Sequence, residues 1–129
     1  MNKQLIELQR GCKAVCVVIL EQHSKELDQG IIMDANMADE YLFARTLGNP
    51  IFREKLDEKA NKYDLTYFVI RGISEISVEQ QNRYIGLVKD REFGGYNIPN
   101  NVILVFTLKT QEELQKLSKD LYHFCVVAF

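Results

Sequence analysis

Short, almost uniformly apolar segments constrain the fold of this chain more than any other feature. Tyr67–Ile70 reads YFVI, Val102–Thr107 reads VILVFT, Phe124–Phe129 reads FCVVAF, and Ala14–Leu20 contains VCVVIL. Strands that are apolar on both faces are typical of a parallel sheet with a cover on each side. A further short strand is predicted at Gly30–Met33.

Helical patterns lie between these strands. Two capping boxes, Ser77 with Gln80 and Thr110 with Glu113, predict helix starts, because each pair would satisfy free backbone amides. The helix after Thr110 is predicted to continue to Leu121. The helix after Ser77 has a stripe with a period of about 3.6 residues, made of Val78, Gln81, Tyr84, Ile85 and Val88. Three other segments are predicted as helices: Asn2–Arg10, Ala38–Leu47 and Ile51–Tyr63.

This alternation predicts an α/β fold, a three-layer sandwich around a mostly parallel sheet of about four to five strands. With 129 residues, 2 prolines, 7 glycines and no linker-like stretch, residues 1–129 are expected to form one domain.

Composition excludes several classes of protein. The net charge is −2, without a Lys/Arg block, so neither nucleic acid nor a membrane is an expected partner. The longest apolar run, Ala14–Leu20, is too short to span a bilayer, and the residues before it do not form a signal peptide. Three cysteines without such a signal indicate reduced, structural thiols and a cytoplasmic location. Cys12, Cys16, His23 and His123 lack the spacing of metal ligands, so no metal is expected.

From Phe68 to Phe129 the chain resembles the second half of the nucleotide-binding core of AAA+ ATPases, closest to the MoxR-like branch. The resemblance rests on residues that fall into the family's pattern without a gap: Ile73, Glu79, Gln81-Asn82, Ile85, Arg91, Gly94-Gly95, Ile98-Pro99 and Asn101-Val102. It implies a P-loop-NTPase-like fold in which the strands at Tyr67–Ile70 and Val102–Thr107 lie side by side.

The resemblance also implies that the family's chemistry is lost. Arg71 stands where the family has the Asp of its Mg²⁺ shell, and Gly72 stands where it has the Glu that activates water. An arginine does not ligate a cation, and a glycine has no base. Lys109 stands at the sensor Asn, and His123 lies near the place of a missing arginine. We therefore expect no catalytic residues, no enzyme activity and no cofactor.

The phosphate-binding loop of such enzymes, G-x-x-x-x-G-K-[ST], occurs nowhere in the chain. Either Met1–Leu5 is a remnant of its end, or Ala14–Leu20 is the first strand and Glu21–Ser24 replaces the loop. In both cases the family's helical lid is expected to be absent.

The expected function is a non-catalytic AAA+-like binding or regulatory module that acts through protein–protein contacts. The partner would be an intact AAA+ ATPase or a second copy of the chain. The alternative is a non-hydrolysing anion- or nucleotide-binding protein that uses Arg71 and Lys109. An enzyme of unrelated chemistry on the same scaffold is a third possibility.

Two local expectations follow. If the sheet is family-like, Arg71 and Lys109 face one another, and their repulsion requires a carboxylate, Glu75 or Glu21, or an ordered anion. The residues Phe93, Gly94, Gly95 and Tyr96 form a hairpin signal. This hairpin is either a plain turn or, as in the family, a contact with partners.

Overall fold

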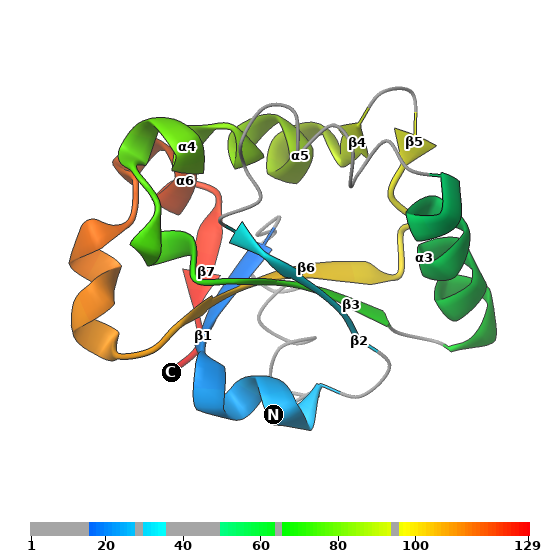
Figure 1. Cartoon of the computed structure of the whole chain (residues 1–129), viewed down its shortest axis with the longest axis horizontal. Helices are drawn as coiled ribbons and strands as arrows, with labels where there is room; N and C mark the ends of the chain where they lie inside the picture. Colours follow the sequence, from blue (N-terminus) through cyan, green and yellow to red (C-terminus); the bar gives the residue numbers. More distant parts are fainter. Residues whose placement is uncertain (1–15, 28–29, 36–49, 64–65, 94–95) are drawn as a thin grey trace.

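A sheet of five parallel strands lies at the centre of the protein, whose structure is a computed structural model (Figure 1). The strands lie in the order β2-β3-β6-β1-β7. Their bounds are β1 Cys16–Leu20, β2 Gly30–Asp34, β3 Thr66–Arg71, β6 Val102–Leu108 and β7 Cys125–Val127. The predicted parallel sheet is confirmed.

The structure describes residues 16–27, 30–35, 50–63, 66–93 and 96–129. The helices predicted for Asn2–Arg10 and Ala38–Leu47 lie outside these residues, as do Cys12, Gly94 and Gly95. The strand predicted from Ala14 is described from Cys16 onward. Among the described helices, none has the length and apolar character needed to cross a bilayer.

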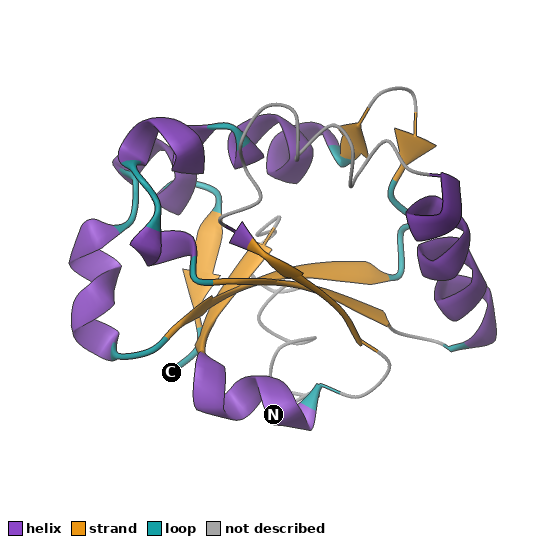
Figure 2. Cartoon of the chain, in the orientation of Figure 1, coloured by secondary structure: helices purple, strands orange, loops and turns teal. Residues whose placement is uncertain are grey.

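Helical segments lie on both sides of the sheet and complete the three-layer α/β sandwich (Figures 1 and 2). In Figure 1, α4, α5 and α6 lie above the sheet, η1 lies below it, and α3 lies at its right-hand end. The α-helices are α3 Pro50–Lys62, α4 Val78–Asn82, α5 Tyr84–Asp90 and α6 Lys119–Tyr122. The 3₁₀ helices are η1 Glu21–Glu26, η3 Ile73–Glu75 and η4 Gln111–Lys116. A small antiparallel hairpin is formed by β4 Glu92–Phe93 and β5 Tyr96–Asn97.

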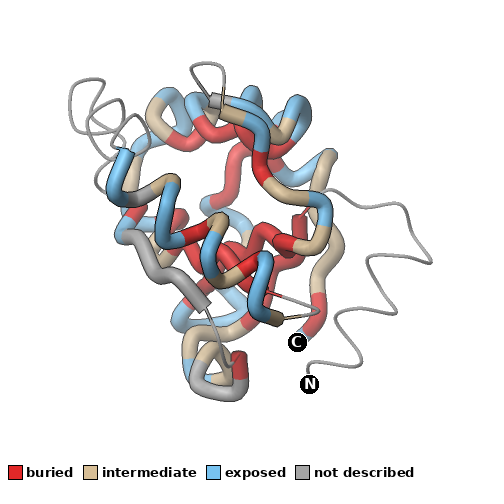
Figure 3. Tube along the Cα trace, turned by 90° about the vertical axis from the view of Figure 1, so that its right-hand side faces the viewer, coloured by how far each residue is buried: buried red, intermediate tan, exposed pale blue. Residues whose placement is uncertain are grey.

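Each strand contributes alternate residues to two separate apolar cores, because successive side chains point to opposite faces of a sheet. The larger core joins the strands to α3, α5 and α6 and includes Val18, Phe68, Ile70, Leu104, Phe106, Leu56, Tyr84, Val88 and Leu121. The smaller core, on the other face, consists of Val17, Ile19, Leu27, Tyr67, Val69, Ile103, Val105 and Ala128. Figure 3 shows the buried residues gathered in the interior and exposed residues on the outer sides of the helices.

The segment after Ser77 differs from its prediction. The capping box is present, with the Gln80 amide donating to Ser77 Oγ and the Ser77 amide donating to Gln80 Oε1, both at 3.2 Å. The predicted single helix is divided, since α4 ends at Asn82 and α5 begins at Tyr84. Val78 is 55% exposed rather than part of the inner stripe, because it lies in the first turn, before Gln81 reaches the core.

The segment after Thr110 is also divided into two, η4 and α6. Ser118 caps a new helix there, because its Oγ accepts the amide of Leu121 at 3.4 Å. The Ser118 amide donates to Gln81 Oε1 at 2.5 Å instead of continuing the first helix. Two short helical segments, each with its own N-terminal cap, therefore take the place of the single helix that the spacing predicts.

The last strand is shorter and less buried than predicted. β7 covers Cys125–Val127 of the apolar run Phe124–Phe129, and its three residues are half-buried. The reason is its place at the edge of the sheet, where β1 is its strand neighbour.

Candidate functional site

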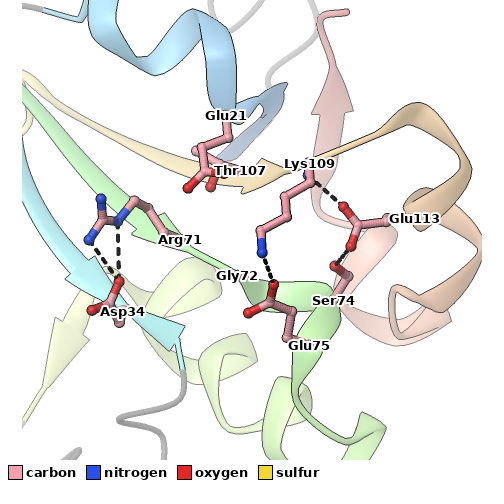
Figure 4. A pocket seen from close by; sticks show the side chains of 9 residues that line it. All are labelled: Glu21, Asp34, Arg71, Gly72, Ser74, Glu75, Thr107, Lys109 and Glu113. Atoms are coloured by element: carbon pink, nitrogen blue, oxygen red, sulfur yellow. Dashed lines mark hydrogen bonds and ion pairs between the residues drawn. The ribbon is translucent and has the colours of Figure 1, made fainter.

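A pocket of about 260 Å³ lies at the carboxyl ends of the central strands (Figure 4). In open parallel sheets this edge is where ligands usually bind. Strands β1, β2, β3 and β6 all end there, and η3 and η4 close one side. The pocket is lined by Glu21, Asp34, Arg71, Gly72, Ser74, Glu75, Thr107, Lys109 and Glu113.

Strand register brings the first group of these residues together. Asp34 is the register partner of Arg71, and Arg71 is the register partner of Thr107. The three residues form a row across β2, β3 and β6, and they share a face of the sheet with Tyr67 and Val69. The carboxyl ends of β3 and β6 therefore lie side by side, as the AAA+ resemblance implies.

Arg71 is paired with Asp34. Its Nη2 and Nε both donate to Asp34 Oδ1, at 3.0 and 3.2 Å. The two side chains are 41% and 54% exposed, so solvent screens the pair. Asp34 was not among the predicted partners because it ends a strand 37 residues earlier in the chain. A carboxylate directly after the apolar run Gly30–Met33 is the sequence feature that would have pointed to it.

Lys109 is paired with Glu75, one of the two predicted carboxylates. Lys109 Nζ lies 2.8 Å from Glu75 Oε1. The hydrogen bond and charge of Glu75 raise the pKa of Lys109, and the nearby charges of Glu21 and Glu113 add to the effect. Glu21, the other predicted carboxylate, is a pocket residue, but the ion pairs of the two cations are made by Asp34 and Glu75.

The two cations do not face one another. Figure 4 shows the Arg71 guanidinium turned toward Asp34 and the Lys109 ammonium turned toward Glu75, on opposite sides of the pocket. Their mutual repulsion is thus relieved by two separate carboxylates, and the expectation of one shared partner is wrong.

Glu113 joins η4 to η3 at the margin of the pocket. It accepts hydrogen bonds from Ser74 Oγ at 2.9 Å and from the amides of Lys109 and Thr110 at 2.5 and 3.0 Å. Burial raises the pKa of Glu113, but these three donors outweigh it, so the pKa lies below its ordinary value. Sequence reasoning identified Glu113 as a capping residue and missed its place in the pocket.

Gly72 has a conformational role. Its φ is +74°, in the left-handed region, where the chain turns from β3 into η3. A β-carbon there would lie 3.0 Å from Glu75 Oε2. Any larger residue at this position would be strained.

Thr107 contributes an unpaired hydroxyl. It is 1% exposed, and its Oγ1 is one of three buried side-chain atoms in the described residues that have no hydrogen-bond partner. The others are His23 Nδ1 and Thr66 Oγ1, and neither residue lines the pocket. The hydroxyl was missed because Thr107 looks, in the sequence, like the last residue of an apolar strand.

Taken together, the charged lining residues are four carboxylates and two cations, a formal surplus of two negative charges. In the part of the chain that the structure describes, His, Cys, Asp and Glu form no group of three or more that could hold a metal ion. The residues after β1 form η1, which begins with Glu21.

The predicted hairpin lies away from this pocket, beside α3 and toward the other end of the sheet in Figure 1. Phe93 and Tyr96 are paired across it, and Gly94-Gly95 lie outside the described residues. Tyr96 Oη donates to Asp57 Oδ1 at 2.8 Å, and the Arg53 guanidinium carbon lies 5.2 Å from the ring centre. Tyr96 thus attaches the hairpin to α3.

Comparison of the chain with known protein families, with curated proteins and with solved structures gives no match in any of the three.

Proposed function

We propose that this chain is a non-catalytic, AAA+-like binding or regulatory module that acts through contacts with another protein. The observation that carries the proposal is the lining of the pocket at the carboxyl edge of the sheet. There Arg71 and Gly72 stand where the AAA+ resemblance implies two carboxylates, and four carboxylates of the lining outnumber two cations that are both paired.

This lining opposes the binding of a nucleoside triphosphate. Two like charges about 5 Å apart repel by about 3 kcal/mol at an effective dielectric constant of about 20. A triphosphate would meet several such repulsions, and the chain has no G-x-x-x-x-G-K-[ST] loop to offset them. The same charges oppose the alternative, an anion site at Arg71 and Lys109, because an anion would have to displace Asp34 or Glu75.

Apolar side chains on the surface support a role in protein contacts. Ile51, Val78, Tyr122 and Phe129 are 62%, 55%, 43% and 39% exposed. In the described sheet, β2 and β7 are the edge strands, and an edge strand presents unpaired backbone groups. The proposed partner is an intact AAA+ ATPase, with a second copy of this chain as the other candidate.

Two measurements test the proposal. We expect no magnesium-dependent ATP hydrolysis from the native chain or from the double variant Arg71→Asp/Gly72→Glu, since neither has a loop to hold the phosphates. Hydrolysis by either protein would overturn the non-catalytic assignment. Thermal shift with ATP and with inorganic phosphate should show no stabilisation, whereas a ligand at about 100 times its Kd would add about 2.7 kcal/mol.

The protein-contact role is tested by light scattering after size-exclusion chromatography and by affinity capture from the native host. We expect self-association or a stoichiometric partner that Val78→Glu or Tyr122→Glu weakens. Glu54→Lys, a change at an exposed position of α3, is the matched control and should have no effect. A monomer without a partner would contradict this role.

A further inference from the structure

The pocket at the carboxyl edge combines a formal surplus of two negative charges with a buried hydroxyl that has no hydrogen-bond partner. Arg71 and Lys109 are each held by one oxygen of a carboxylate, Asp34 Oδ1 and Glu75 Oε1. Glu113 is occupied by three donors from the protein. Glu21 is the remaining carboxylate of the lining, and it is half-buried at the start of η1.

The unpaired hydroxyl of Thr107 is the second, independent observation. Buried polar atoms in folded proteins nearly always have a partner, and each exception requires an explanation. Thr107 Oγ1 is such an exception, in a residue that is 99% buried and lines the pocket. Thr107 in β6 is the register partner of Ile19 in the neighbouring strand β1, and Glu21 follows two residues later at the start of η1.

The chemistry of the Glu21 carboxylate and the Thr107 hydroxyl indicates the kind of ligand. A hydroxyl and a carboxylate both accept hydrogen bonds, and the formal surplus of two negative charges favours a cation. A metal ion is a poor candidate, since no group of three or more possible ligands exists among the described residues. An ammonium group is a compact cation with three donors and no acceptor, which matches the lining.

We infer that this pocket binds a primary ammonium group, with the Glu21 carboxylate and the Thr107 hydroxyl oxygen as its acceptors. The volume of about 260 Å³ has room for the ammonium and the first carbons of its chain. The group can belong to a free small amine or to a lysine side chain of a bound peptide, because both present the same donors.

This inference does not rest on the proposed function. A chain without ATPase activity can bind a protein through its apolar surface whether or not the pocket takes an amine. The two experiments have separate readouts, so failure of one leaves the other standing.

The test is calorimetric titration of the full chain with n-butylammonium chloride and, separately, with the blocked peptide acetyl-Gly-Lys-Gly-amide. Tetramethylammonium chloride is the control, since it has the same charge but no N–H donor. We expect saturable binding of at least one of the two ammonium probes and none of the control. Binding of butylammonium alone or of the peptide alone identifies the source of the amine.

Two variants locate the site. Glu21→Gln and Thr107→Val should each weaken binding, Glu21→Gln by about tenfold because a charge-assisted hydrogen bond is lost. Thr107→Val also removes an unpaired buried hydroxyl at constant shape, so its melting temperature should stay level or rise while its affinity falls. A purely structural threonine would not show this combination.

Glu54→Gln, the same change on the exposed face of α3, should leave affinity unchanged. The inference is overturned if neither ammonium probe binds, if tetramethylammonium binds equally well, or if Glu21→Gln and Thr107→Val both retain full affinity.

Discussion

The two ends of strand β6 each have an arginine close by, and the two arginines are held in different ways. At the amino end, Arg91 Nη2 donates to the backbone carbonyls of Pro99 and Val102, at 2.8 and 2.6 Å. At the carboxyl end, Arg71 donates to the side chain of Asp34 and is 41% exposed. Burial lowers the pKa of Arg91.

The amino end is a network of side chains that bond to the backbone. Asn101 Nδ2 donates to the carbonyls of Ala60 and Tyr63, at 2.7 and 3.0 Å, and so attaches β6 to the end of α3. Gln81 has the same role elsewhere, since its Nε2 donates to the carbonyls of Ile76 and Lys116 at 3.1 and 3.0 Å. These donors satisfy backbone groups that would otherwise be orphaned on burial.

The carboxyl end is built from side chains that bond to one another at the surface. Its ion pairs, Arg71–Asp34 and Lys109–Glu75, are exposed and are expected to contribute little to stability. Gln81, Arg91 and Asn101 therefore satisfy backbone groups in the interior, whereas Arg71 and Lys109 lie at the pocket.

The largest expected loss of stability comes from replacing Arg91, and the same replacement of Arg71 provides the comparison. Arg91→Met leaves two carbonyls at the start of β6 without a donor and should lower the free energy of unfolding by about 2–3 kcal/mol. Arg71→Met is the matched control and should cost less than about 1 kcal/mol. Urea denaturation followed by circular dichroism measures both. Equal losses of unfolding free energy in the two variants would contradict the distinction between the amino and carboxyl ends of β6.

The second effect contrasts two glycines. Gly72→Ala places a β-carbon at positive φ and 3.0 Å from Glu75 Oε2, and should destabilise the protein by about 1–2 kcal/mol. Gly86→Ala is the control, because Gly86 lies in α5 with nothing within 4 Å of an added β-carbon. It should stabilise the protein by about 0.5–1 kcal/mol. Thermal unfolding of the two variants should therefore shift in opposite directions.

Local pattern predicted the sheet well. The apolar runs at Tyr67–Ile70 and Val102–Thr107 became β3 and β6, because a strand that is covered on both faces is apolar along most of its length. The capping box at Ser77 was also predicted, since its partners are three residues apart. The break before Ser118 was not, because it depends on a hydrogen bond to Gln81, 37 residues away.

The pocket could be predicted only in part. Arg71 and Lys109 were identified because each stands near the end of a predicted strand, at a position that the AAA+ resemblance marks, and Glu75 because it is near Arg71 in sequence. Asp34 and Thr107 enter the site through strand register, which a single sequence does not specify. Their side chains determine whether the pocket has a surplus of positive or negative charge, so the kind of ligand could not be inferred without the fold.

The third effect concerns Glu113, which joins η4 to η3 at the margin of the pocket. Its pKa is lowered in the folded state, so its ionised form stabilises the protein above the ordinary value of 4.5, and this contribution is lost as the pH falls through the lowered pKa. Glu113→Gln should cost about 1 kcal/mol at pH 7. The difference from wild type should shrink below pH 4.5.

Glu112→Gln is the control for Glu113, as its side chain is exposed in the same turn of η4. It should change stability little at either pH. Chemical denaturation at pH 7 and at acidic pH measures both variants. A loss for Glu113→Gln that stays constant with pH would mean that the charge of Glu113 has no part in joining η3 to η4.

The smallest effect is the coupling within the Arg71–Asp34 pair itself. A double-mutant cycle with Arg71→Met and Asp34→Asn should give a coupling energy of about 0.2–1 kcal/mol, because both side chains are exposed to solvent. The coupling should fall toward zero in 1 M NaCl, where the Debye length is about 3 Å. A coupling above about 2 kcal/mol that persists in salt would be the behaviour of a buried, structural pair. Arg71 would then stabilise the fold as Arg91 does. The carboxyl end of the sheet would no longer differ from the amino end in having charged residues that contribute little to stability and are available to bind a ligand.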